Sequence, residues 1–331
     1  MGTFIFDELT GIPTVLATNR ITRPDKTGVT TGKVVKKSDK EGKEPRKPAR
    51  EDTDTYKNDC FFCKGNEHMT PPATYQDSDD WNVRVFMNKF PIVDDHEIIV
   101  HSPYHDKDLT ELPEEQNVRY VRALLNRVNH YTTKGMEVML FNNRGGKAGA
   151  SVLHPHSQLV ALEGFPGIIE LEKHEAIRYY NEHHSCYWCD MLKSELVIKE
   201  RVVYESSHFV IIVPKASRWT YEMMLVPKAH RPNIEYINER EINDFAKLLK
   251  ASLAAYDKLF DRPDRNFWIH TQRYDPYHWH VGYIPHIKMF GGLELGANIW
   301  VSDKASPEDA ADQLGEAVRE VYEDGVTSLA D

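Results

Sequence analysis

Two pairs of cysteines in this chain have the spacing of a metal site or a redox site. Cys60 and Cys63 form one C-x-x-C pair, and Cys186 and Cys189 form the other. Such a turn can place two thiolates on one cation, and it can also act as a redox dithiol. Four cysteines are too few for a disulfide scaffold in 331 residues, so we expect a protein of the reducing cytoplasm.

Histidines accompany both cysteine pairs at matching positions. Five landmarks recur in the same order with offsets of 124 to 126 residues, namely Cys60 and Cys186, Cys63 and Cys189, His105 and His230, His154 and His278, and His156 and His280. Landmarks that recur in order at one offset indicate an internal repeat. The chain is therefore expected to be a tandem duplication of one unit.

Each half offers two thiolates and two imidazoles to a metal ion. The first set is Cys60, Cys63, His105 and His154, and the second is Cys186, Cys189, His230 and His278. Tetrahedral Zn²⁺ takes such a set, and four protein ligands make a structural site. The histidines lie too far from the cysteines for a zinc finger. A net charge of −10 also argues against binding to nucleic acid or an anionic membrane.

One histidine beside the first set is left over. Residues two apart in an extended segment point to the same face, so a metal on His154 would orient His156. The glycine-rich segment 144–151 can turn backbone N–H groups toward an anion, and Ser151 adds a hydroxyl. An imidazole beside a phosphate can attack phosphorus. The residues alone leave open whether His156 is a nucleophile or a further metal ligand.

Similar elements surround both motif sets, and they predict an α+β fold. In the first half we expect strands at 81–86, 97–100 and 137–141, and a helix at 114–131. In the second half we expect strands at 208–213, 223–226 and 266–270, and helices at 239–260 and 307–322. No apolar run is long enough for a membrane span, and residues 1–10 lack the basic start of a signal peptide.

The chain divides into three regions. We expect an N-terminal arm and a charged loop in residues 1–59, a first domain in residues 60–170 and a second domain in residues 171–331. Segment 33–58 has nine basic and six acidic residues. It is too polar to bury enough surface, so we expect a mobile loop.

Several motifs together resemble the galactose-1-phosphate uridylyltransferase family of the histidine-triad superfamily, close to its ADP-glucose phosphorylase-like branch. The motifs are CFFCKGNE at 60–67, NKFP at 88–91, FNNRGGKAGAS at 141–151, HPHSQ at 154–158, HWH at 278–280 and GGLE at 291–294. The resemblance implies two histidine-triad-like domains in tandem, each an antiparallel sheet with flanking helices. It also implies that the domain at 60–170 is catalytic, that the domain at 171–331 holds a structural metal and the sugar contacts, and that the protein is a homodimer.

The resemblance implies a ping-pong reaction. His156 attacks the α-phosphorus of a nucleotide sugar, a sugar 1-phosphate leaves, and a second sugar 1-phosphate takes the nucleotidyl group from the histidine. The expected reaction moves UMP from UDP-glucose to galactose 1-phosphate or another hexose 1-phosphate. Gln158 would hold the α-phosphate oxygens, and Ser151 is the third catalytic residue.

The binding residues follow from the same motifs. Those implied for nucleotide and phosphate are Arg20, Arg23, Phe62, Asn88, Phe90, Asn143, Gly149 and Ala150, with the two arginines acting across the dimer. Lys288 and Glu294 fall where family members contact the hexose and its phosphate.

Departures from the family pattern leave alternatives. Some members bind iron in the second half through one glutamate and three histidines, which here would be Glu172, His270, His278 and His280. Leu293 replaces a usual tyrosine, and Ser157 with the doubled C-x-x-C also occurs in nucleotide-sugar phosphorylases that use inorganic phosphate. A non-enzymatic nucleotide- or zinc-binding protein is a third reading. The histidines without a partner pattern are expected to be solvated or locally bonded, namely His68, His96, His101, His174, His183, His184 and His286.

Overall fold

The computed structural model describes residues 3–9, 11–16 and 53–327. Residues 33–52 of the mobile loop expected at 33–58 lie outside the described residues, whereas the end of that segment is ordered, with a bridge between Thr53 and Tyr56 and a buried Tyr56. Arg20 and Arg23 lie outside the described residues too.

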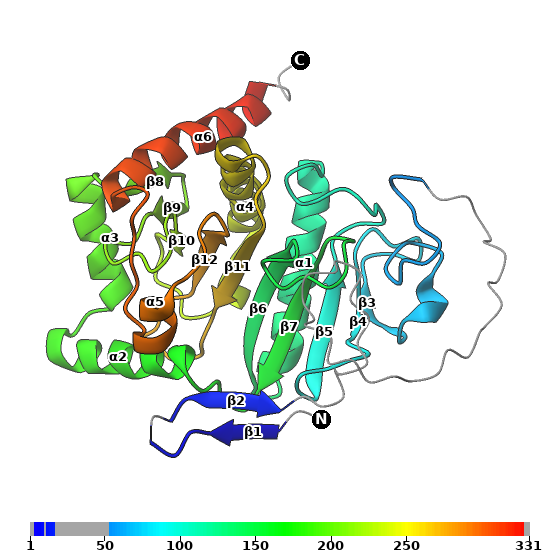
Figure 1. The fold of residues 1–331 in the computed structure, drawn as a ribbon, viewed down its shortest axis with the longest axis horizontal. Helices are drawn as coiled ribbons and strands as arrows, with labels where there is room; N and C mark the ends of the chain where they lie inside the picture. Colours follow the sequence, from blue (N-terminus) through cyan, green and yellow to red (C-terminus); the bar gives the residue numbers. More distant parts are fainter. Residues whose placement is uncertain (1–2, 10, 17–52, 328–331) are drawn as a thin grey trace.

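A single antiparallel sheet of ten strands runs through the molecule in the order β3-β4-β5-β7-β6-β11-β12-β10-β9-β8 (Figure 1). The strands of its first half are β3 (Ala73–Gln76), β4 (Arg84–Met87), β5 (Asp95–Val100), β6 (Glu137–Arg144) and β7 (His156–Leu162). Those of its second half are β8 (Val202–Glu205), β9 (Phe209–Ile212), β10 (Met223–Pro227), β11 (Arg265–His270) and β12 (His280–Pro285).

The two halves of the sheet have the same topology. Each half has three strands, a long helix and two more strands, and in each the last strand pairs with the third and the fourth. The halves meet where β6 pairs antiparallel with β11, with Phe141 opposite Trp268. The expected duplication is confirmed. The two five-stranded units join edge to edge, which the chain's internal offsets did not indicate.

Helices cover one face of the sheet and form the main core. They are α1 (Glu114–Thr132), α4 (Glu239–Phe260) and α6 (Pro307–Thr327). Asn238 and Glu241 form a capping box that starts α4. Strand side chains alternate between the faces, so Ile99 packs in this core whereas Ile98 and Val100 face the opposite side.

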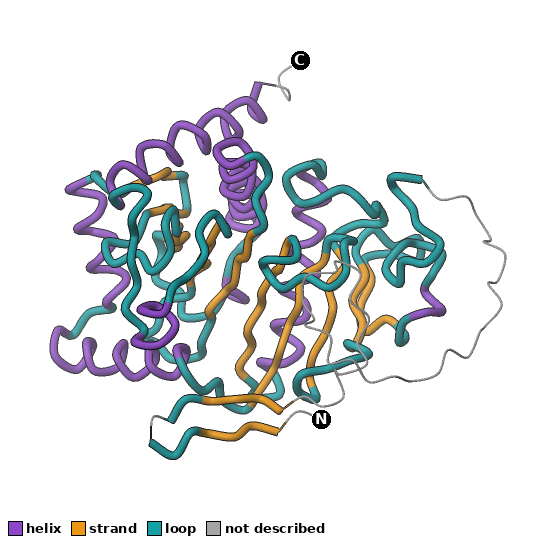
Figure 2. The backbone as a smooth tube through the Cα atoms, in the orientation of Figure 1, coloured by secondary structure: helices purple, strands orange, loops and turns teal. Residues whose placement is uncertain are grey.

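The opposite face differs between the halves. In the second half it is covered by α2 (Ile168–His183) and α3 (Tyr187–Ile198), with the short α5 (Gly292–Ala297) nearby. In the first half loops surround β4 and β5 (Figure 2), and the short 3-10 helix η2 (Glu67–Met69) lies among them. This loop-covered face carries His156 and Gln158, because β7 turns alternate residues toward it.

The expected strands and long helices are present within a few residues of the predicted bounds. The edge strands β3 and β8, the strand β12 and the helices α2 and α5 were not expected, nor was the hairpin of β1 (Thr3–Phe6) and β2 (Pro13–Leu16). A second 3-10 turn, η3 (Ile234–Tyr236), precedes α4. Among the described residues, no helix has the length and apolar character that crossing a bilayer requires.

Candidate active site

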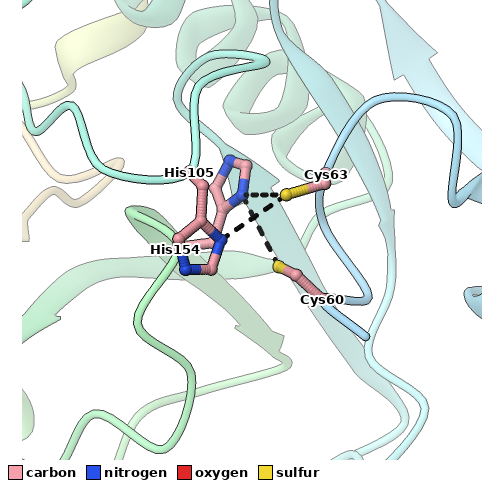
Figure 3. A group of neighbouring side chains, drawn as sticks. All are labelled: Cys60, Cys63, His105 and His154. Carbon is pink, nitrogen blue, oxygen red and sulfur yellow. Dashed lines mark hydrogen bonds between the residues drawn. The ribbon is translucent and has the colours of Figure 1, made fainter. Parts of the chain in front are cut away.

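The first cysteine and histidine set converges on one point (Figure 3). The C-x-x-C turn precedes β3, His105 follows β5, and His154 precedes β7. The His154 Nδ1 atom lies 3.7 Å from the Cys60 sulfur and 3.6 Å from the Cys63 sulfur, and His105 Nδ1 lies 3.5 Å from the latter. A tetrahedral zinc ion separates sulfur and nitrogen ligands by about 3.6 Å. The donor set therefore fits a four-coordinate metal ion.

Surrounding groups orient these ligands. His154 Nε2 donates to the Ser102 carbonyl over 2.9 Å, which leaves Nδ1 as the ligand atom. Hydrogen bonding with Cys63 lowers the pKa of the Cys60 thiol to about 2, against the effect of burial. A thiolate is the form of cysteine that binds metal.

The second set converges in the same way. Its ligand atoms come together with Cys189 Sγ 3.4 Å from His230 Nδ1 and 3.6 Å from His278 Nδ1. His230 Nε2 donates to the Asp275 carbonyl over 2.6 Å. Hydrogen bonding with Cys189 lowers the pKa of Cys186 to about 4. This set also fits a metal ion, and both predicted ligand sets are thus assembled.

A third cluster lies beside the second set. Glu172 on α2 accepts from His270 Nδ1 over 2.9 Å and from the Tyr277 hydroxyl over 2.7 Å, and His280 Nε2 lies 3.9 Å from the same oxygen. Burial raises the pKa of Glu172, but His270 and its hydrogen bonds outweigh burial and hold that pKa at about 2. The four residues of the iron alternative are therefore divided, because His278 belongs with the cysteines.

His156 is held at the start of β7 with one ring nitrogen defined. Its Nδ1 atom lies 2.9 Å from the His154 carbonyl oxygen, which can only accept, so the ring proton is on Nδ1. The Asn142 amide donates to the His156 carbonyl over 2.7 Å and fixes the strand there. The Phe62 ring and the imidazole pack in a T-shaped arrangement with centroids 5.0 Å apart. The lone pair of the neutral ring is thus on Nε2, the atom from which His156 could act as a nucleophile.

A mainly apolar cavity opens beside His156. Its lining includes six of the residues predicted from the sequence, namely Phe62, Asn88, Phe90, Ser151, His156 and Gln158. Asn88 Oδ1 accepts from the Phe90 backbone N–H over 2.9 Å, which fixes the turn that carries both. An apolar slot with polar groups at one end suits a flat base with its phosphates near His156.

The glycine-rich loop separates this cavity from a second, polar one. Asn143 and Ala150 line the second cavity together with His156. Gly149 has a φ of +85°, and a Cβ there would lie 3.7 Å from the Asn143 amide nitrogen. The second half of the chain supports the loop, because Asp264 accepts from the Lys147 N–H over 2.6 Å and Asn266 donates to Asn143 Oδ1 over 2.8 Å.

The two predicted sugar contacts lie elsewhere. Lys288 follows β12 and Glu294 is in α5, and the two side chains form an ion pair of 3.6 Å. Neither residue lines the two cavities beside His156. Within one described chain, they are therefore not brought to the candidate nucleophile.

Two histidines expected to be solvated or locally bonded are buried and bonded across strands. His96 lies 3.0 Å from Gln158 Oε1 and His101 lies 2.8 Å from Ser157 Oγ. The sequence did not indicate these contacts because a histidine in or directly after an apolar strand has no characteristic spacing. The alternation of side chains along a strand could have indicated that His96 is buried, since His96 and Ile98 point to the same face of β5.

Comparisons with known proteins cover both halves. Residues 172–296 match the family described as galactose-1-phosphate uridyl transferase, C-terminal domain, and residues 76–174 match the Ap4A phosphorylase N-terminal domain.

Individual relatives extend the similarity over most of the chain. A galactose-1-phosphate uridylyltransferase of Thermotoga maritima is 31% identical over 242 residues, which is 68% of this chain and 74% of that protein. An ADP-glucose phosphorylase of Arabidopsis thaliana is 26% identical over 291 residues, 78% of this chain and 81% of that protein. The solved structure of a GalT-like protein from Arabidopsis thaliana is 28% identical with a TM-score of 0.71, covering 79% of this chain and 93% of that one.

Proposed function

The chain belongs to the galactose-1-phosphate uridylyltransferase family, and on this premise we propose that it moves UMP from UDP-glucose to galactose 1-phosphate or another hexose 1-phosphate. The observation that carries the proposal is the position of His156. It lies where the apolar cavity meets the glycine-rich loop, and Gln158 faces the same cavity. A nucleophile, a base-sized slot and phosphate-binding donors are thus adjacent.

The first half-reaction forms a bond between His156 Nε2 and the α-phosphorus. The bond from that phosphorus to the bridging oxygen breaks, and glucose 1-phosphate leaves with the electron pair. The His154 carbonyl holds the Nδ1 proton and so steadies the imidazole as it gains positive charge. In the second half-reaction a phosphate oxygen of the hexose 1-phosphate attacks the same phosphorus, and the bond to Nε2 breaks.

The other predicted residues fit roles around this phosphorus. Gln158 and Ser151 would donate to the α-phosphate oxygens, while Phe62 and Phe90 would enclose the base and Asn88 would lie near the ribose. Asn143, Gly149 and Ala150 would line the phosphates. We place the sugar contacts Lys288 and Glu294, and the phosphate contacts Arg20 and Arg23, at the interface of a homodimer, where a partner subunit would complete the site.

We assign Zn²⁺ to both Cys2His2 sets. Four protein ligands leave no open position, so each ion would hold the fold and take no part in the reaction. The first ion would fix His154, and through the strand it would hold the backbone of His156.

Incubation with UDP-glucose alone tests the proposal. Wild type should gain the mass of one UMP on His156 and release glucose 1-phosphate, because the first half-reaction needs no acceptor. His156→Asn should gain none. An unlabelled wild type, or a label that persists in His156→Asn, would refute the mechanism.

Similarity to the Arabidopsis ADP-glucose phosphorylase supports a second candidate, in which inorganic phosphate accepts a nucleotidyl group from ADP-glucose. The same chemistry on His156 serves both reactions. Two comparisons distinguish the reactions. The first asks whether ADP-glucose or UDP-glucose labels His156 faster, and the second asks whether inorganic phosphate or galactose 1-phosphate removes the label. Turnover of any nucleotide sugar excludes a purely structural or binding role.

A further inference from the structure

The amide of Gln158 has two orientations of almost equal shape but opposite chemistry. One presents the NH2 group to the cavity, and the other presents the oxygen. Phosphate oxygens can only accept hydrogen bonds, so only the first orientation stabilises a bound α-phosphate. We propose, on the basis of the function proposed above, that His96 is a positioning residue that sets this orientation.

The backbone defines the tautomer of His96. The Ile92 N–H donates to His96 Nδ1 over 3.0 Å. A backbone N–H cannot accept, so Nδ1 must carry the lone pair, and the ring proton lies on Nε2. The Asn88 amide nitrogen also lies against this ring, 3.3 Å from Nε2 and 3.5 Å from Nδ1, so Asn88 does not distinguish the two ring nitrogens. The Ile92 N–H alone therefore assigns the lone pair to Nδ1.

The defined tautomer then orients Gln158. His96 Nε2 lies 3.0 Å from the end of the Gln158 side chain, and both residues are buried. Since Nε2 donates, the atom facing it must be the oxygen, Oε1. The register allows this contact because His96 is opposite Val160, two residues from Gln158 on the same face of β7. The NH2 group is left for the cavity.

Two substitutions at His96 test the Nε2 hydrogen-bond donor apart from the other contacts of the imidazole ring. The amide nitrogen of glutamine reaches about as far from the backbone as Nε2, so His96→Gln keeps a donor for Gln158. Asparagine ends near the position of Nδ1, so His96→Asn keeps a group for the Ile92 N–H and loses the donor. The two variants are equally polar, which makes them a matched pair.

The test measures single-turnover labelling of His156 with the nucleotide sugar that labels wild type. His96→Asn should slow labelling about 100- to 1000-fold, as for the loss of one oriented donor to a transition-state oxygen, and His96→Gln should stay within about 3-fold of wild type. In a Gln158→Ala background neither substitution should slow it further, because His96 acts through Gln158. Bound metal should be unchanged in both variants, so that a difference in labelling between them reports on Gln158 and not on loss of the metal site. Equal slowing by both variants, or slowing that persists in the Gln158→Ala background, would overturn the inference.

A spectroscopic measurement separates this inference from the proposed function. Long-range ¹H–¹⁵N spectra report which nitrogen of each histidine is protonated, and the His96 signal is the one lost in His96→Gln. A proton on Nε2 alone is expected, and a proton on Nδ1 would overturn the inference whatever the activity. If no nucleotide sugar labels wild type while His96 shows the Nε2 tautomer, the proposed function fails and the orientation of Gln158 stands.

Discussion

Successive residues of β7 serve opposite faces of the sheet. His156 and Gln158 face the cavity, whereas Ser157 between them faces the core. There the Ser157 hydroxyl is 2.8 Å from both His101 Nε2 and the Tyr120 hydroxyl. These hydrogen bonds hold β7 from the core side of the sheet. The positions of His156 and Gln158 therefore depend on buried groups, His101 and Tyr120, that do not line the cavity.

His101 should make the protein sensitive to acid. Burial lowers the pKa of His101 from 6.5 to about 3. Between pH 6.5 and 3, His101 is therefore protonated in the unfolded chain and neutral in the folded chain. The contribution of neutral His101 to the free energy of unfolding is complete above pH 6.5 and is lost as the pH falls toward 3. We expect His101→Phe to be less stable than wild type by about 1 kcal/mol at pH 7.5. The gap should close or reverse by pH 4.5, since one pKa unit corresponds to about 1.4 kcal/mol.

Urea unfolding of both proteins at pH 7.5, 5.5 and 4.5 measures this gap. Tyr120 remains as a partner for Ser157 in the variant, so its strand should keep its place. A gap that stays constant with pH would mean that His101 does not titrate in this way.

The glycine-rich loop is the element whose shape depends most on distant residues. Gly145 has a φ of +85°, and a Cβ there would be 1.9 Å from Asp264 Oδ1. The same carboxylate accepts from the Lys147 N–H, and Asn266 donates to the Ala148 carbonyl over 3.0 Å. The loop that reaches His156 from the first half is therefore held by β11 and the turn before it.

Gly145→Ala should displace Asp264 and release the loop. Labelling of His156 should fall about 10- to 100-fold, because misplacing groups around a reacting atom by about 1 Å is costly. The strain should also cost about 1–3 kcal/mol of stability. Gly164→Ala is the matched control, since a Cβ there meets nothing within 4 Å. Labelling is compared with thermal unfolding for both variants, and an unimpaired Gly145→Ala would show that the loop does not position the site.

At the scale of the molecule, the two halves of the sheet share one topology but differ in the residues around their equivalent histidines, His156 and His280. Gly282 faces Trp268 across the strands as Gln158 faces Phe141. A Cβ on Gly282 would lie 2.6 Å from the Trp268 indole, so that space holds no side chain. Burial also lowers the pKa of the equivalent histidine, His280, to about 4. The second half thus lacks the amide beside its histidine, which favours a supporting role for it.

The two metal sets should also differ in their effect on the reaction at His156. Cys60→Ser and Cys186→Ser should each remove one metal ion per chain and lower the thermal midpoint, because each deletes one of four ligands. Only Cys60→Ser should also slow labelling of His156, by about 10-fold or more, since His154 lies two residues from His156. Elemental analysis and labelling of the two variants provide the comparison. Equal slowing by both would show that the first site does not brace His156.

The sequence by itself determined the duplication, the two ligand sets and the order of the main elements. These features are periodic or local, so they can be read from offsets, from C-x-x-C spacing and from apolar repeats. The edge strands β3 and β8 escaped because each is four residues long and only partly buried. The joining of the halves through β6 and β11 escaped because hydrogen bonds between those strands leave no spacing pattern.

Only the tertiary structure decided which neighbours act on the candidate site. His96 is 62 positions from Gln158, and Asn266 is 123 positions from Asn143. Neither separation is a motif, because the contacts arise when distant strands come into register. The same register places Trp268 where it excludes a side chain at position 282. Sequence spacing could therefore identify candidate phosphate-binding groups, whereas the direction in which each amide points depends on hydrogen bonds formed only in the folded sheet.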